Sequence, residues 1–177
     1  MRGFALALGL AVMLAAPAFG SVPPGGIALQ DQSGRRFSLN DLRGRPVVVT
    51  FVASRCLDAC PIADGVFARV RDELAAQHLR AMLVTITLDP RYDTPFVMAA
   101  QAQRFDAKPS QWRFASGRAG DIHRLMHALG VASVPDAKGV PELHSSFIYV
   151  FDARGRYRKA LMLSTNSVAD IMREIKS

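Results

Sequence analysis

The sequence predicts an α/β fold in which helices cover both faces of a central mixed sheet, with a β-hairpin extension at its N-terminal side. Two short runs of apolar and β-branched residues, 47–53 and 81–88, are typical of strands that are buried on both faces. Each run is followed by a segment whose apolar residues recur at helical spacing. Strands and helices that alternate in this way form a sheet between two helical layers.

Several element boundaries carry their own signals. Pro61 lies near the first turn of the first helix, where its missing N–H costs little. Thr94 followed by Pro95 is typical of an N-cap and a first helical residue, and Gly130 ends the third helix. The expected elements, in chain order, are hairpin 27–39, strand 47–53, helix 61–77, strand 81–88, helix 95–105, strand 111–116, helix 119–129, loop 131–143, strand 144–152, strand 157–163 and helix 167–176.

This order of elements is the thioredoxin-like arrangement, with extra strands at the front and an extra strand–helix segment in the middle. In that arrangement the chain leaves the first central strand and turns into a helix whose first turn carries cysteines. Cys56 and Cys60 lie at this point of the sequence.

The first twenty residues have the pattern of a signal peptide. Arg2 precedes an apolar run over 4–16, and the small residues Ala18 and Gly20 suit a signal-peptidase site. The run is shorter than the roughly 20 residues that span a bilayer, and no cysteine follows it for a lipid anchor. We therefore expect a periplasmic protein, with a membrane-tethered form facing the periplasm as the alternative. The predicted organisation is a signal peptide over 1–20, a flexible tail over 21–27 and one domain over 28–177.

The charge of the chain is positive but scattered. There are 22 Lys and Arg residues against 15 Asp and Glu, a net charge of +7 at pH 7. No basic run is interleaved with aromatic residues, which argues against nucleic acid as a partner. The surplus would favour an acidic partner or anionic lipid heads, so we expect membrane contact to be peripheral only.

The chain has only two cysteines, Cys56 and Cys60, with three residues between them. A bridge between them would close too short a loop to stabilise the fold through chain entropy. A redox couple and a metal site stay open. At the start of a helix we expect at least one thiol with a lowered pKa. If both cysteines are helical, they share one face, about 6 Å apart at Cα. That separation allows a disulfide or two bonds to Cu(I) or zinc.

Two thiolates need a third ligand, and the chain has four histidines. His144 opens the predicted strand 144–152, at the place that faces the start of the cysteine helix in a thioredoxin-like sheet. We therefore expect His144 to be the third ligand. His123 and His127 are expected on the polar face of the third helix, and His78 at the far end of the cysteine helix.

Four segments together resemble the motifs of the SCO/SenC family of copper chaperones. They are TFVASRCLDACP, TLDPRYDTP, QRFDAKPSQWRFASG and HSSFIYVFDARGR, and the similarity runs from about residue 27 to 176. The resemblance implies a thioredoxin-like fold and a copper ion, Cu(I) or Cu(II), held by Cys56, Cys60 and His144. For Cu(II) an oxygen of the DPRYDT loop is a candidate weaker ligand.

The resemblance also implies a role in building the binuclear copper centre of cytochrome c oxidase subunit II. The protein would deliver copper to that subunit or to another copper-accepting protein, after receiving it from an upstream periplasmic donor. The alternative is a thiol–disulfide oxidoreductase that reduces the cysteines of the copper-receiving subunit, with Cys56 and Cys60 as its catalytic pair. A peroxide-reducing enzyme fits the spacing less well, and a copper-sensing or storage domain stays open. We expect a metallochaperone rather than an enzyme.

The loop over 89–94 departs from the family pattern. The family has Asp-Pro-Glu-Arg-Asp-Thr, whereas Arg91 and Tyr92 stand here in place of the acidic and basic residues. Asp89 and Asp93 are kept. We expect Asp89 to be a turn residue and Asp93 to support the start of the following helix.

Overall fold

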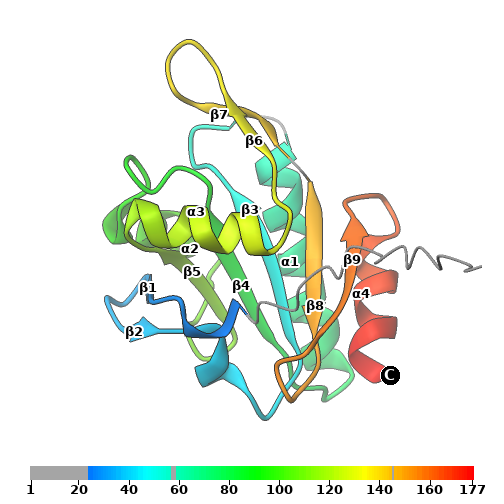
Figure 1. Ribbon diagram of the computed structural model, residues 1–177. Coiled ribbons are helices and arrows are strands. Elements are labelled where there is room, and N and C mark those ends of the chain that lie inside the picture. The colour runs from blue at the N-terminus through cyan, green and yellow to red at the C-terminus, as the bar shows by residue number, and fades with distance from the viewer. Residues whose placement is uncertain (1–23, 57–58, 145) are drawn as a thin grey trace, which may run out of the picture.

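The computed structural model describes residues 24–56, 59–144 and 146–177. In these residues a mixed sheet lies between helical layers (Figure 1). The elements are η1 (Pro24–Gly26), β1 (Leu29–Asp31), β2 (Arg36–Phe37), η2 (Leu39–Leu42), β3 (Val47–Val52), α1 (Ala59–Ala76), β4 (Met82–Thr87), α2 (Pro95–Arg104), β5 (Trp112–Ser116), α3 (Ala119–Ala128), β6 (Ser133–Pro135), β7 (Pro141–His144), β8 (Phe147–Phe151), β9 (Tyr157–Met162) and α4 (Ser167–Lys176).

The predicted signal peptide lies outside the described residues and stays a prediction. Within the predicted tail, residues 24–26 form η1, and Ile27 packs against the core. None of the helices in the described part of the chain combines the length and apolar character that a membrane span needs.

The main sheet has seven strands in the order β2-β1-β5-β4-β3-β8-β9. The three central strands β3, β4 and β5 run parallel, and the pairs on either side of them are antiparallel. The front hairpin β1–β2 extends one edge, and the hairpin β8–β9 forms the other. The predicted mixed sheet with an added N-terminal hairpin is confirmed.

The core forms two layers because successive side chains of a strand point to opposite faces. On β3, Val47, Val49 and Phe51 join one cluster, which α3 covers with Ile122. Val48 joins the cluster on the other face, where α1, α2 and α4 pack. Every residue of β3 and β4 is buried, as the continuous apolar runs predicted.

The helix boundaries agree with their sequence signals. The Thr94 hydroxyl accepts a hydrogen bond from the backbone N–H of Val97, and Pro95 is the first residue of α2. Gly130 follows α3 with a φ of +67°, a conformation that a Cβ disfavours. These local signals fix where α2 begins and where the chain leaves α3.

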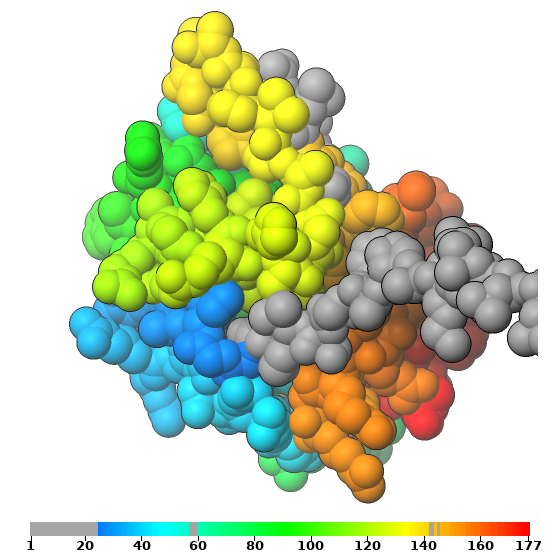
Figure 2. Space-filling model, viewed as in Figure 1, coloured from blue at the N-terminus to red at the C-terminus, as the bar shows by residue number. Residues whose placement is uncertain are grey.

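The segment 131–143 is not a loop, and the prediction there was wrong. It forms most of a second, two-stranded sheet, in which β6 and β7 pair antiparallel. Its turn is closed by the Asp136 carboxylate, which accepts hydrogen bonds from the backbone N–H groups of Lys138 and Val140. This hairpin projects above α3 at the top of the molecule (Figure 2).

The same correction moves His144. It ends β7 instead of opening the next strand, and β8 begins only at Phe147.

Candidate metal centre

Cys56 lies in the turn that follows β3. Its backbone N–H donates a hydrogen bond of 3.0 Å to the carbonyl of Ala53, and its side chain is half-buried. The parallel strand β3 ends at Val52, so this turn lies at the C-terminal edge of the sheet. That is the edge at which α/β proteins place their sites.

Cys60 lies in the first turn of α1 and is only 4% exposed. Its sulfur accepts a hydrogen bond of 3.3 Å from the backbone N–H of Ala53, and it packs with Val52 and Ala63. Cys56 precedes α1, which begins at Ala59, so the condition that both cysteines are helical is not met. The turn nevertheless brings the two sulfurs within 4.8 Å of each other.

Burial raises the pKa of the Cys60 thiol far above its usual value, against the lowering effect of the Ala53 hydrogen bond. The neighbouring Cys56 and Asp64 raise it further. Cys60 is therefore not a thiol with a lowered pKa, because removing the sulfur from water outweighs the effect of the helix terminus. Without a cation beside it, Cys60 stays a thiol.

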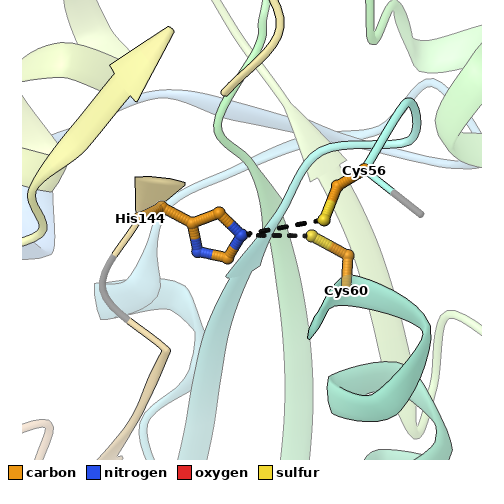
Figure 3. A group of neighbouring side chains, drawn as sticks. All are labelled: Cys56, Cys60 and His144. Atoms are coloured by element: carbon orange, nitrogen blue, oxygen red, sulfur yellow. Dashed lines mark hydrogen bonds between the residues drawn. The ribbon is translucent and has the colours of Figure 1, made fainter. Parts of the chain in front are cut away.

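His144 reaches both sulfurs from the β6–β7 hairpin (Figure 3). Its Nε2 atom lies 3.4 Å from the sulfur of Cys60 and 3.9 Å from that of Cys56. Its other ring nitrogen, Nδ1, is buried and has no hydrogen-bond partner among the described residues. The structure thus brings together the three side chains that the sequence singled out.

The two sulfur–nitrogen distances have the spacing of a three-coordinate site. Bonds of about 2.0–2.3 Å from thiolate sulfur and imidazole nitrogen, spread at 120°, place the donors roughly 3.5–4.0 Å apart. The two observed sulfur–nitrogen distances, 3.4 and 3.9 Å, lie close to that range. Among the described residues, no other cluster of three Cys, His, Asp or Glu side chains has metal-binding geometry.

Asp93 holds the turn of Cys56 in place, a role that the sequence reasoning missed. Its carboxylate is fully buried and accepts hydrogen bonds from the backbone N–H and the hydroxyl of Ser54. It also accepts one of 2.7 Å from the Thr87 hydroxyl at the end of β4. Burial raises the pKa of Asp93, and the hydrogen bonds from Ser54 and Thr87 oppose that rise.

Arg55 ties three segments around the site together. Its guanidinium pairs with Asp89 at 2.6 Å and lies over the ring of Tyr92, 4.4 Å from the centroid. It also reaches the carbonyl of Gly139 in the β6–β7 hairpin at 3.5 Å. Arg55 thereby links the turn of Cys56 to the hairpin that carries His144.

Neither carboxylate of the 89–94 loop joins the group of donor atoms. Asp89 is engaged with Arg55, and both oxygens of Asp93 are engaged with Ser54 and Thr87. Neither the Asp89 nor the Asp93 carboxylate is therefore placed to supply an oxygen ligand to the metal.

The other histidines lie apart from the cysteines. His123 and His127 are exposed on α3, which confirms that they lie on its polar face, and His78 is exposed after the end of α1.

Four large apolar side chains are exposed to solvent on elements that carry or flank the site. They are Ile62, Tyr92, Phe96 and Val134.

A family model described as SCO1/SenC matches residues 25–177. The chain belongs to the SCO1/SenC family. An SCO2-like protein of Rickettsia felis is 29% identical over 157 residues, which cover 86% of this chain and 75% of the relative.

Two solved structures place the fold. A SCO1/SenC family lipoprotein from Bacillus anthracis str. Ames has a TM-score of 0.77 and 24% identity, covering 84% of this chain and 90% of that one. Yeast Sco1 with copper bound has a TM-score of 0.72 and 26% identity, covering 86% and 88%. The fold is therefore the thioredoxin-like fold of the Sco1 structures, as the order of elements predicted.

Proposed function

We propose that this protein binds copper through Cys56, Cys60 and His144 and works as a metallochaperone. The observation that carries the proposal is the meeting of two sulfurs and one imidazole nitrogen within 4.8 Å. Two thiolates and an imidazole suit Cu(I), a soft ion that accepts low coordination numbers. The copper bound to yeast Sco1, which shares this fold, supports the same choice of metal.

The burial of Cys60 suits a cation as its partner. A thiolate in this surrounding is costly alone, because burial raises its pKa. A bound copper ion supplies the compensating charge, and each thiol that becomes a ligand releases its proton to solvent. Copper binding therefore takes up one ion and releases the proton of the Cys60 thiol.

The proposed receiving protein rests on the resemblance to the family. Resemblance to SCO copper chaperones supports cytochrome c oxidase subunit II, or another copper-accepting protein, as the acceptor and a periplasmic copper protein as the donor. Cys56 and His144 are only half-buried, so an incoming thiolate or imidazole reaches the site from solvent. Ile62 is 60% exposed on α1, which carries Cys60, and Val134 is 58% exposed on β6, which pairs with the strand that carries His144. Both side chains give a partner an apolar contact.

The protein acts in the periplasm under this proposal. The predicted signal peptide over 1–20 supports export. A membrane-tethered form facing the periplasm is the alternative, and the relative from Bacillus anthracis is a lipoprotein.

Anaerobic titration of the reduced protein with copper tests the metal site. We expect one copper ion per chain and, with Cu(II), a thiolate-to-copper charge-transfer band. His144→Ala should lower the affinity at least about tenfold, because one of three ligands is lost. His123→Ala is the matched control, since this histidine is exposed on α3. Equal affinity of the two variants would refute the site.

A second function has its own support in the structure. One sulfur is half-exposed and the other buried, within 4.8 Å of each other, which is the arrangement of an attacking and a resolving thiol. Cys56 as thiolate would attack a disulfide of the copper-receiving subunit and form a mixed disulfide. Cys60 would then release the reduced partner, so that two thiols here become a disulfide and two electrons and two protons pass to the partner.

The two functions differ in their need for His144. A chaperone should lose copper transfer to the metal-free subunit II domain when His144 is replaced by alanine. A reductase should keep its turnover of the oxidised subunit in the metal-free state. Transfer that survives His144→Ala would overturn the chaperone proposal, and the absence of disulfide reduction by the metal-free protein would overturn the second.

A further inference from the structure

A second concave feature lies at the edge of the sheet opposite to the cysteines. It is a cleft of about 240 Å³ between the end of α1 and the residues that lead into β3, β4 and β5. Because these three strands are parallel, their N-terminal ends share one edge, whereas Cys56 follows the other end of β3. A six-residue strand separates the two by roughly 20 Å. Residues that line the cleft include Arg45, Arg71, Arg80, Leu74, Leu83 and Ser110.

Three arginines line this cleft, and two of them have no acidic partner. Arg71 pairs with Asp72 at 2.8 Å. In the described part of the chain, neither Arg45 nor Arg80 forms an ion pair with a carboxylate. The three arginines of the cleft, with Asp72 as the one acidic partner among them, therefore leave this surface with a net positive charge.

Arg45 is half-buried beside a like charge. Burial, followed by the nearby charge of Arg80, lowers the pKa of Arg45. One guanidinium N–H donates to the carbonyl of Ser110 at 3.0 Å, which fixes the side chain in the cleft. Two like charges beside a partly desolvated surface are stabilised when an anion binds between them.

The other residues that line the cleft also favour a bound anion. The floor is apolar, formed by Leu74, Leu79 and Leu83, so a charge bound above it is screened less than in open water. Ser110 and Gln111 line the same cleft and carry neutral donors. The planar fork of a guanidinium matches the oxygens of a phosphate group.

We propose that this cleft binds a phosphate group, with Arg45 and Arg80 as its charged partners. The phosphate group belongs either to the headgroup of an anionic phospholipid or to a free phosphate ester. With a lipid, the protein lies on the membrane with its cysteine edge directed away from the surface. The inference does not depend on the metal site, which lies at the other edge of the sheet.

Inorganic phosphate is the first probe, followed through the NMR signals of the arginine side chains in the reduced, metal-free protein. We expect saturable shifts for Arg45 and Arg80. The double variant R45Q/R80Q lacks these two signals, so it is followed through the side chain of Arg71 and the backbone N–H groups of Ser110 and Gln111, which line the same cleft. Their phosphate-dependent shifts should be present in the wild type and absent in R45Q/R80Q. Arg80 is exposed, so R80Q alone should fold normally and weaken phosphate binding roughly fivefold. No saturable shift, or the same response in R45Q/R80Q, would overturn the proposal.

Vesicles separate the two sources of the phosphate group. Flotation with phosphatidylglycerol in phosphatidylcholine vesicles is compared with phosphatidylcholine alone. The matched control is R154Q/R158Q, which removes the same charge from exposed arginines outside the cleft. A larger loss of vesicle binding in R45Q/R80Q supports the lipid headgroup. Equal losses in both double variants would show that vesicle binding follows the charge of this edge of the sheet, where the β8–β9 turn also lies, and would rule out the lipid headgroup as the ligand of the cleft itself. The phosphate titration then decides for or against a free ester.

Copper titration keeps this test distinct from the test of the metal site. R45Q/R80Q should bind copper with unchanged affinity, because the cleft shares no residue with the donor group. A failure of phosphate binding with normal copper binding would overturn the cleft proposal alone.

Discussion

Asp64 should make the stability of the reduced, metal-free protein fall as the pH rises from about 4 to about 7. This residue follows Cys60 by one turn of α1 and is 4% exposed. Burial raises the pKa of its carboxyl group to about 7, while a hydrogen bond of 3.1 Å from the Thr85 hydroxyl opposes the rise. The folded protein therefore prefers the neutral acid.

The sign follows from proton binding. In the unfolded chain Asp64 titrates near 3.8, so above that pH the unfolded state loses a proton that the folded state keeps until about pH 7. The stabilisation is fully present below 3.8 and is lost as the pH rises through about 7. A difference of roughly three pKa units, at about 1.4 kcal/mol each, corresponds to about 4 kcal/mol of unfolding free energy.

Urea denaturation of the wild type and of Asp64→Asn, under reducing conditions between about pH 4 and 8, measures this effect. Asparagine keeps an acceptor for Thr85 and cannot titrate. The free energy of unfolding of the wild type should fall relative to that of the variant across this range, and the variant should be the more stable protein at pH 7.5. Two parallel pH profiles would refute the reasoning.

Three further substitutions test contacts around the core and the site. Asp93→Ala should lower both the copper affinity and the free energy of unfolding, because the Ser54 donors that hold the turn of Cys56 lose their buried acceptor. We expect the loss of unfolding free energy to be about 3 kcal/mol. Copper titration and urea denaturation measure the two effects, and an unchanged copper affinity would contradict the positioning role of Asp93. Trp112→Phe should lower the free energy of unfolding by about 1 kcal/mol, because the indole N–H donates a hydrogen bond of 3.0 Å to the Thr85 hydroxyl. An unchanged free energy of unfolding in urea denaturation would contradict this contribution. Gly130→Ala should cost about 1 kcal/mol because of its φ of +67°, and a stabilised variant in thermal melts would show that the backbone there is not strained by a Cβ.

The central strands were accessible from the sequence because their apolar runs are continuous and rich in β-branched residues. The run 47–53 alternates its side chains between two cores, so that both of its faces are buried. The β6–β7 hairpin was missed because its strands have only three and four residues and carry Pro135 and Pro141. Prolines in such short segments indicate a loop unless the partner strand is known.

The meeting of Cys56, Cys60 and His144 was predicted, but the structure revises some of the reasons for that prediction. His144 lies beside the cysteines, as expected, but it arrives on a hairpin that the sequence did not reveal. The pKa of Cys60 moves upward because burial, which depends on Val52 and Ala63, is not visible in the C-x-x-x-C spacing.

Asp93 illustrates what local sequence signals miss. Next to Thr94 and Pro95 it has the pattern of a helix start, yet its partner Ser54 is 39 residues away. Only the fold shows that this carboxylate holds the turn of Cys56.

X-ray absorption at the copper edge of the Cu(I)-loaded protein tests the metal site most directly. We expect two sulfur neighbours at about 2.3 Å and one imidazole nitrogen at about 2.0 Å. In His144→Ala the nitrogen shell should disappear while both sulfurs remain. A spectrum of the wild type without an imidazole nitrogen, or one that His144→Ala leaves unchanged, would show that His144 is not a copper ligand.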